Sequence, residues 1–364
     1  MKPILTILSW IYGAAISIRH RLYNWGILRS YSFDIPIVCI GNITVGGTGK
    51  TPMAEMLIEG LAERYTIAIL SRGYGRSTKG YYEVQTTDNY LQVGDEPLQI
   101  KLKFPETVVV VSENRVEAIA RIRKEHPEVN LIIMDDGFQH RKVKAKVNII
   151  ILDATRPVEN DHLLPRGRLR DLKSRLNKAH IFVVSKCSDQ MSPLERRLWR
   201  NKLCTVAYQK IFFSHIEPQP IEPLFYFEDR EEVDYGCQAI LVAGVGNPRP
   251  FINEAQIRFN IVDKMIMPDH HVYNKQDMRQ LSEMLARHPR AIILMTEKDA
   301  IKLFRATSLP EPLRRAMYYQ PIKTTLLEGP DKDFWGKVID DIEFKYEEKA
   351  SKKSNKEIIL DEER

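Results

Sequence analysis

The hydrophobic positions of this chain come in short runs separated by segments of helical length, the pattern of a parallel β-sheet covered by helices. The runs are rich in Val and Ile, and they end in turn residues. Up to residue 205 the predicted strands are residues 36–40, 66–70, 107–111, 130–134, 147–152 and 181–184. The predicted helices are residues 52–64, 97–104, 115–126 and 193–203. The pattern predicts one doubly wound α/β domain over residues 31–207.

The pattern changes beyond this domain. Residues 208–236 are broken by prolines and favour β structure, so we expect a β-rich connector there. Alternation of strands and helices then resumes and predicts a second, smaller α/β domain over residues 237–346. Its predicted strands are residues 239–243, 259–264 and 291–295, and its predicted helices are residues 250–256, 274–288 and 298–304. Residues 347–364 are mostly Lys and Glu and are expected to be a disordered tail.

Glycines cluster directly after the first predicted strand, in the sequence GNITVGGTGKTP at residues 41–52. A strand, a glycine turn and a helix in this order favour a phosphate cradle, in which backbone N–H groups and the helix N-terminus face phosphate oxygens. Lys50 would reach the β- and γ-phosphates, and the Thr51 hydroxyl would bind Mg²⁺. The predicted phosphate-binding residues are Thr44, Val45, Gly46, Gly47, Thr48, Gly49, Lys50 and Thr51.

Two further features of the sequence indicate the metal ligands and the identity of the nucleotide. The apolar run 131–134 ends in Asp135 and Asp136, as a Walker B strand does, so both carboxylates are candidate Mg²⁺ ligands opposite Thr51. A GTPase would carry N-K-x-D after a late strand, and the nearest sequences, SKCS at 185–188 and TEKD at 296–299, differ from it. The sequence therefore predicts ATP as the nucleotide, with Mg²⁺.

The N-terminal residues 1–30 predict a membrane-associated helix. Residues 3–18 are uncharged and mostly apolar, but a bilayer core needs about 20 such residues, so a helix lying in the interface fits better than a spanning one. Arg19, Arg21 and Arg29 follow and suit anionic lipid. A cleaved signal peptide and a buried core helix are the alternatives, although export would separate the nucleotide loop from ATP.

Composition agrees with a globular protein of two ordinary domains: 364 residues, 43% of them hydrophobic. The four cysteines are scattered, as expected of reduced core thiols in a cytosolic protein. The net charge of +6 is uneven, with a basic stretch over residues 166–178 that suits an anionic partner or forms a solvated face. Aromatic residues are not interleaved with this stretch, which argues against nucleic acid.

Eight sequence motifs, taken in order, resemble the tetraacyldisaccharide 4′-kinase family of lipid A biosynthesis. The resemblance spans about residues 1–305, and it includes the N-terminal membrane helix and the non-glycine Thr44 of the loop. The motifs are GNITVGGTGKTP (41–52), SRGYGR (71–76), GDEP (94–97), SENR (112–115), DDGFQHR (135–141), LLPRGRLRD (163–171), PDHH (268–271) and TEKDAIK (296–302).

The resemblance implies a P-loop kinase-like fold and transfer of the ATP γ-phosphate to the 4′-hydroxyl of an acylated glucosamine disaccharide 1-phosphate, forming lipid IVA. It implies work at the cytoplasmic face of the inner membrane. The charge pattern adds anionic membrane lipids as expected partners and no nucleic acid, and no obligate protein partner is evident from the sequence. Lys50 and Asp95 would be catalytic, Asp95 as the base for the sugar hydroxyl, supported by His270. Without the resemblance, Asp95 could equally be a helix N-cap and His270 an ordinary loop histidine.

The same resemblance implies further polar residues facing nucleotide or sugar. They are Arg72, Arg76, Asn114, Arg115, Gln139 and Arg170. Arg166 and Arg168 stand where family members read LLPAGNLRE or similar, so they would either bind the 1-phosphate or face solvent. A membrane-associated P-loop switch ATPase is the alternative function, but its loop would carry lysine at Val45 and it would need no large second domain.

Overall fold

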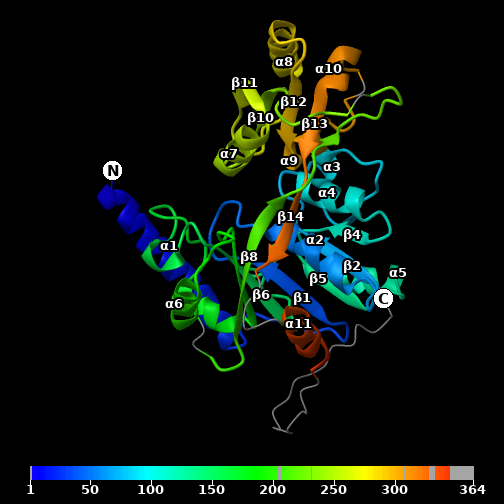
Figure 1. The fold of residues 1–364 in the computed structure, drawn as a ribbon. Coiled ribbons are helices and arrows are strands. Elements are labelled where there is room, and N and C mark those ends of the chain that lie inside the picture. Colours follow the sequence, from blue (N-terminus) through cyan, green and yellow to red (C-terminus); the bar gives the residue numbers. More distant parts are fainter. Residues whose placement is uncertain (1, 204–205, 231, 307, 328–332, 345–364) are drawn as a thin grey trace.

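The computed structural model describes residues 2–203, 206–230, 232–306, 308–327 and 333–344, which form two α/β domains and an N-terminal helix (Figure 1). The predicted tail at 347–364 and Cys204 lie outside the described residues. Of the other cysteines, Cys39 and Cys187 are buried and Cys237 is partly buried, and all three are free thiols.

The first domain is built on a nine-stranded sheet with the order β14-β8-β7-β6-β1-β5-β2-β4-β3. Its strands are β1 (Ile37–Gly41), β2 (Ile67–Ser71), β3 (Tyr82–Glu83), β4 (Val108–Val111), β5 (Leu131–Met134), β6 (Val147–Asp153), β7 (Ile181–Ser185), β8 (Lys210–Pro218) and β14 (Ile322–Leu326). Neighbouring strands are parallel except at the two edges, where β3 pairs with β4 and β14 with β8 in antiparallel fashion. The predicted doubly wound parallel sheet is confirmed.

Helices cover both faces of this sheet. On one face lie α2 (Lys50–Leu61), α4 (Asp95–Lys103) and α11 (Phe334–Glu343), and on the other lies α5 (Arg115–Glu125), with α3 (Tyr90–Val93) and α6 (Pro193–Leu203) at the periphery. Alternate residues of β1 enter the two cores: Val38 and Ile40 face α2, whereas Ile37 and Cys39 face α5. Burial on both faces explains why the strands read as continuous apolar runs.

The second domain has a five-stranded sheet with the order β11-β10-β12-β13-β9. Its elements are β9 (Glu222–Pro223), β10 (Gln238–Ala243), α7 (Arg249–Arg258), β11 (Asn260–Ile266), α8 (Lys275–Arg287), β12 (Ile292–Thr296), α9 (Glu297–Leu303), α10 (Glu311–Ala316) and β13 (Met317–Gln320). Leu281 of α8 packs on one face of the sheet and Ala255 of α7 on the other. The smaller α/β domain is thus present.

The chain crosses between the two sheets twice, which the predicted boundaries did not include. β8, inside the segment expected to be a connector, pairs with β7 and extends the large sheet. β14 and α11, inside the expected second domain, return to the first domain, and Gln219 N donates to Pro321 O across the two crossings at 2.9 Å. Strand membership depends on partners distant in sequence, so a local pattern of prolines could not reveal it.

The N-terminal helix α1 (Lys2–Asn24) lies against the loop at 163–171. Ser9 Oγ donates to Leu163 O at 2.8 Å, and His20 Nε2 lies 2.7 Å from Asp171 Oδ1. The opposite face is apolar and exposed, with Trp10 70% and Ile11 61% exposed, so α1 is not the buried core helix considered above. Within the described residues, the structure contains no helix with the length and apolarity needed to cross a membrane. Association with a membrane stays a prediction.

Candidate active site

The glycine loop connects β1 to α2 at the carboxyl edge of the sheet, as predicted. Gly46 has φ 103° and Gly49 has φ 91°, a left-handed backbone that glycine adopts without strain. Gly49 is also the N-cap of α2 and brings no side chain to cap the helix. The first N–H groups of α2 are therefore left for a ligand, and with the helix dipole they form an anion site.

Two residues at the end of β7, Ser185 and Lys186, hold the loop from behind. Ser185 Oγ donates to Thr48 O at 2.6 Å, and Lys186 Nζ donates to Gly47 O. Lys186 has φ 58° and is ion-paired at 2.7 Å with the buried Asp153, the last residue of β6. Because these groups bind the outward carbonyls, the N–H groups of the loop are turned the other way, toward the phosphate position.

No motif announces this support. Ser185 and Lys186 belong to a sequence that differs from the guanine motif, but a polar pair directly after a predicted buried strand was a signal that they lie at the ligand-binding edge of the sheet. Asn42 was missed as well: its Nδ2 donates to Thr48 Oγ1 at 2.8 Å from a fully buried position.

The two Walker B carboxylates differ in environment. Asp136, with φ 47°, accepts hydrogen bonds from both terminal nitrogens of Arg170, one of them at 2.9 Å, and its Oδ1 lies 3.8 Å from Lys50 Nζ. Burial alone would raise the pKa of Asp136, but Arg170 and Lys50 outweigh burial and lower this pKa to about 2. Asp136 is therefore a carboxylate that orients Lys50 and Arg170.

Asp135 is only 1% exposed, and its Oδ1 has no hydrogen-bond partner among the described residues. Burial, followed by the charge of Glu96, raises the pKa of Asp135 to about 7. A buried carboxylate oxygen without a partner beside a phosphate loop fits a hard cation such as Mg²⁺, which takes carboxylate and phosphate oxygens as ligands. The residues present thus fit the predicted metal.

The loop at 163–171 pairs along the start of the glycine loop. Val45 N donates to Arg168 O and Arg170 N donates to Ile43 O, both at 2.8 Å, and Thr44 and Leu169 form a β-bridge. Arg170 also contacts Asn42, whose carbonyl accepts a hydrogen bond from Gln139 Nε2 at 2.8 Å. Gln139 and Arg170, predicted to face a substrate, thus also hold the loop in place. The Val45 N–H is occupied here by protein.

Four other predicted substrate residues differ in their surroundings. Arg115 is 4% exposed and donates to the carbonyls of Asp135 and Asp136 at 3.0 and 3.2 Å, so it supports the Walker B turn from inside. The Arg76 guanidinium is held by Gly80 O and Glu113 at 2.6 and 2.7 Å. Asn114 contacts Glu117 at 2.9 Å. Arg72 is exposed.

Asp95 and His270 meet where the two domains touch. Asp95 Oδ2 lies 3.1 Å from His270 Nδ1, although the residues are 175 positions apart in sequence. The N-cap of α4 is Gly94, and Asp95 is the first helical residue, so its carboxylate is not an N-cap. His270 has φ 57° and its ring lies 5.3 Å from that of Tyr74.

Charges keep Asp95 ionised. Burial alone would raise the pKa of Asp95, but the His270 hydrogen bond and then Lys298 outweigh it and lower this pKa to about 2. The same hydrogen bond raises the pKa of His270. The next residue, Glu96, pairs with Lys298 of α9 and is close enough to Lys50 and Asp135 to interact with their charges. Asp95 is therefore kept in its ionised form, and its neighbour Glu96 interacts with Lys50 of the phosphate loop.

Comparison with known proteins gives one consistent result. Residues 1–341 match the family model of tetraacyldisaccharide-1-P 4′-kinase. The tetraacyldisaccharide 4′-kinase of Porphyromonas gingivalis is 39% identical over 95% of this chain and 97% of its own length, and that of Bacteroides thetaiotaomicron is 35% identical over 90% and 89%. The crystal structure of LpxK from Aquifex aeolicus in complex with ATP superposes with a TM-score of 0.73 at 25% identity, covering 94% of this chain and 99% of that one. The chain belongs to the tetraacyldisaccharide-1-P 4′-kinase family.

Proposed function

We propose that this protein transfers the γ-phosphate of ATP to the 4′-hydroxyl of a tetraacylated glucosamine disaccharide 1-phosphate, forming lipid IVA. The observation that carries the proposal is the contact between Asp95 and His270, 3.1 Å long at the domain junction, with Asp95 adjacent in sequence to a residue that interacts with Lys50. A P-loop switch ATPase has no need for a second domain that brings a histidine to such a carboxylate.

Different groups of the site would bind the phosphates, accept the proton and hold the metal. The loop N–H groups and Lys50 bind the phosphates, and the acceptor hydroxyl approaches the γ-phosphorus from the side of Asp95. As the new O–P bond forms and the bond to ADP breaks, Asp95 takes the hydroxyl proton, while His270 holds the carboxylate in orientation. When bound, Mg²⁺ would be held by Thr51 and the Asp135–Asp136 pair and would neutralise charge on the phosphates.

We also place the enzyme at the cytoplasmic face of the inner membrane, bound peripherally to anionic lipid through α1. The support is the exposed apolar face of α1, followed by Arg19 and Arg21 at its end. The face carries Ile4, Ile7, Leu8, Trp10, Ile11 and Ile18. Because α1 also contacts the loop that pairs with the phosphate loop, a lipid acceptor would reach the site from the bilayer surface.

A transfer assay tests the proposal. The protein in detergent micelles is incubated with γ-labelled ATP, Mg²⁺ and the tetraacyl disaccharide 1-phosphate, and the labelled lipid is separated by chromatography. Label should appear in the lipid and should not appear when the 4′-hydroxyl is blocked. ATP hydrolysis on anionic vesicles without labelled lipid would instead favour the switch ATPase.

The matched inactive variant is Lys50→Ala. Removing a fixed positive charge from the transferring group should lower kcat by about a hundred- to a thousand-fold, while circular dichroism and the melting temperature stay close to wild type. A folded Lys50→Ala protein with full activity would contradict the role given to the loop.

A further inference from the structure

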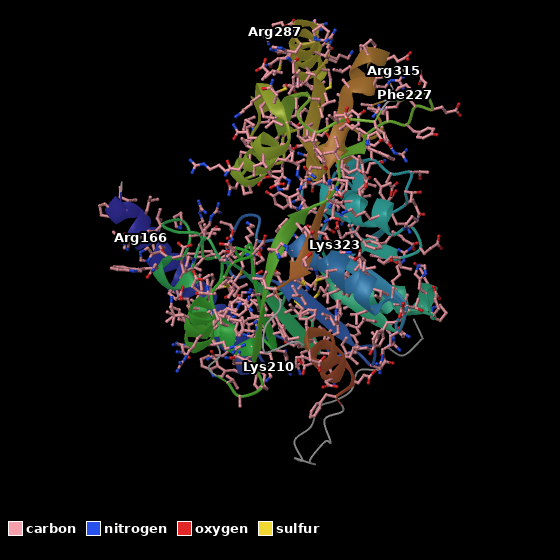
Figure 2. All side chains as sticks on the ribbon, in the orientation of Figure 1. Arg166, Lys210, Phe227, Arg287, Arg315 and Lys323 are labelled. Atoms are coloured by element: carbon pink, nitrogen blue, oxygen red, sulfur yellow. The ribbon has the colours of Figure 1, made fainter. Side chains whose placement is uncertain are left out.

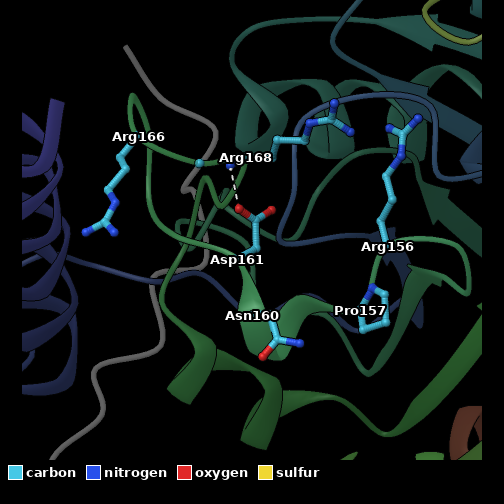
Figure 3. Close-up of a pocket in the computed structure, with 7 residues that line it drawn as sticks. Arg156, Pro157, Asn160, Asp161, Arg166 and Arg168 are labelled. Carbon is cyan, nitrogen blue, oxygen red and sulfur yellow. Dashed lines mark hydrogen bonds between the residues drawn. The ribbon is translucent and has the colours of Figure 1, made fainter. Parts of the chain in front are cut away.

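A basic hollow lies beside the phosphate loop, between residues 156–161 and the loop at 163–171 (Figure 3). Its volume is about 550 Å³, and three arginines, Arg156, Arg166 and Arg168, line it together with Asp161. Nη1 of Arg156 lies 3.9 Å from the position that a Cβ on Gly46 would occupy, so the hollow borders the phosphate loop itself.

The three arginines of this hollow exceed its one acidic residue, Asp161. Within the part of the chain that the structure describes, none of the three guanidinium groups has a hydrogen bond or an ion pair. Asp161 uses Oδ1 to accept from the backbone N–H groups of His162 and Arg168, at 2.7 and 3.1 Å. The nearby Glu159 is ion-paired with Lys202 at 3.1 Å.

The backbone that carries Arg166 and Arg168 is already held in place. Leu164 N donates to Leu169 O and Leu169 N donates to His162 O, both at 2.9 Å. A Cβ on Gly167, between the two arginines, would lie 2.2 Å from His162 O, so the turn requires glycine. Because the backbone of the turn is already fixed, binding an anion here would order only the arginine side chains.

The hollow also connects the phosphate loop to the membrane-facing helix. The carbonyl of Arg168 accepts from Val45 N in the phosphate loop, and the neighbouring Leu163 accepts from Ser9 of α1. The Arg166 side chain extends toward α1, whereas those of Arg156 and Arg168 extend away from it (Figure 3). An anion bound here would therefore lie between the nucleotide and the bilayer surface.

We propose that this hollow binds a phosphomonoester, namely the 1-phosphate of the acceptor disaccharide, with Arg156 and Arg168 on one side of the hollow and Arg166 on the side of α1. Arginine matches phosphate through paired N–H donors, and the volume admits a phosphate with part of the attached sugar. This inference rests on the proposed function and deepens it: the site would recognise the end of the acceptor that does not react. An anionic lipid headgroup offers the same chemistry, so the test must separate the two sources.

The test compares two acceptors in the wild type and in Arg166→Gln/Arg168→Gln. One acceptor carries the 1-phosphate and the other lacks it. In the wild type, loss of the 1-phosphate should lower kcat/KM by about ten- to a hundred-fold, as expected for charge-assisted hydrogen bonds to phosphate. The variant should use both acceptors about equally, with an unchanged KM for ATP. Arg156→Gln should reduce the discrimination in the same way.

Arg290→Gln is the matched control, since Arg290 is exposed in the second domain, and it should keep the wild-type discrimination. If Arg166→Gln/Arg168→Gln does not fold, the two acceptors are compared in the single variant Arg166→Gln, because Arg166 is exposed. Three results would overturn the inference. The variants could still discriminate between the acceptors with and without the 1-phosphate, or their KM for ATP could rise. The third is an equal loss of kcat/KM on both acceptors together with weaker pelleting on phosphatidylglycerol vesicles. No labelled lipid from the wild type with either acceptor would instead reject the proposed function.

Discussion

At the scale of single residues, the candidate site consists of charges held by other charges. Asp136 sits between Lys50 and Arg170, Asp95 is held by His270, and Lys186 is held by Asp153. Each pair orients a group that the proposed transfer would use, before any substrate binds. Electrostatic preorganisation of this kind is the main means by which phosphoryl transfer is catalysed.

Lys186→Met should weaken ATP binding by roughly ten- to a hundred-fold, because it removes the charged donor to Gly47 O and leaves Asp153 buried without its partner. The KM for the acceptor should change little. Lys186→Arg keeps the positive charge and the hydrogen-bond donor, so it should retain much of the wild-type affinity for ATP. A role of Lys186 in packing alone would not predict this difference between the Arg and Met variants. Titration of a fluorescent ATP analogue measures the effect, and wild-type affinity in Lys186→Met would contradict it.

Asp95→Asn keeps the size of the side chain and removes the proton acceptor, so kcat should fall strongly with little change in ATP affinity. His270→Ala should lower kcat more mildly. If the two residues act as one unit, the double variant should be little slower than Asp95→Asn alone. If the fold-loss in kcat of the double variant equals the product of the two single losses, His270 acts independently of Asp95, on the sugar or the γ-phosphate.

The pH dependence of the pair follows from the directions of its pKa shifts. The pKa of Asp95 is lowered from 3.8 to about 2, so its contribution to stability is present above pH 3.8 and is lost as the pH falls through about 2. The pKa of His270 is raised above 6.5, so its contribution is full below pH 6.5 and is lost as the pH rises through the raised value.

His270→Ala should therefore lower the melting temperature more at pH 5.5 than at pH 9. It should also move the acid limb of the pH–kcat/KM profile to higher pH, because the pKa of Asp95 loses the interaction that lowers it most. Equal melting-temperature differences at both pH values would argue against an ionised pair.

At the scale of elements, α1 has two faces of different character. Ser9, Tyr12 and His20 attach one face to the loop at 163–171, and the opposite face presents exposed apolar side chains. Deleting residues 1–30 would remove both faces and uncover the loop that pairs with the phosphate loop. Substitutions on the exposed face alone make the sharper test.

Trp10→Ser/Ile11→Ser should reduce pelleting with phosphatidylglycerol vesicles, because two exposed apolar side chains are lost from the proposed membrane face. ATP affinity should stay at the wild-type value. Ile257→Ser, which removes an 80% exposed side chain from α7, serves as the control. Unchanged pelleting of the double variant would place the anchor elsewhere, for example in the basic residues 166–178.

At the scale of the whole molecule, the C-terminal segment joins the two domains by returning to the first one. Phe334 of α11 is 1% exposed and packs edge-on against Phe212 of β8, with ring centroids 5.1 Å apart. The neighbouring Trp335 lies over Gly60 of α2, where a Cβ would come within 2.1 Å of its ring. The helix bearing the phosphate loop is thus packed against the end of the chain.

Phe334→Ala should destabilise the first domain by about 3–5 kcal/mol, the usual effect of removing a fully buried phenyl ring. Urea unfolding followed by near-UV circular dichroism measures the change. Tyr226→Ala, at a position that is 83% exposed, should change stability by less than about 0.5 kcal/mol. Equal effects of the two substitutions would show that α11 contributes little.

The sequence by itself determined the features whose parts are neighbours along the chain. The strand, glycine turn and helix around Lys50, the carboxylates that end β5, and the uncharged apolar N-terminal segment are each read from one short stretch. Their physical causes, backbone freedom at glycine, burial of apolar strands and the length of a helix, act over a few residues.

Only the tertiary structure decided the contacts between distant segments. The attachment of Lys186 to Gly47, the pairing of Arg170 with Asp136 and the hollow beside the phosphate loop depend on which strands lie side by side. The pairing of Asp95 with His270 was implied by family motifs, but its geometry depends on the packing of the second domain against the first. Each of these polar side chains could pair with several others in the sequence, and the order of strands in the sheets decides which of them lie close enough to pair.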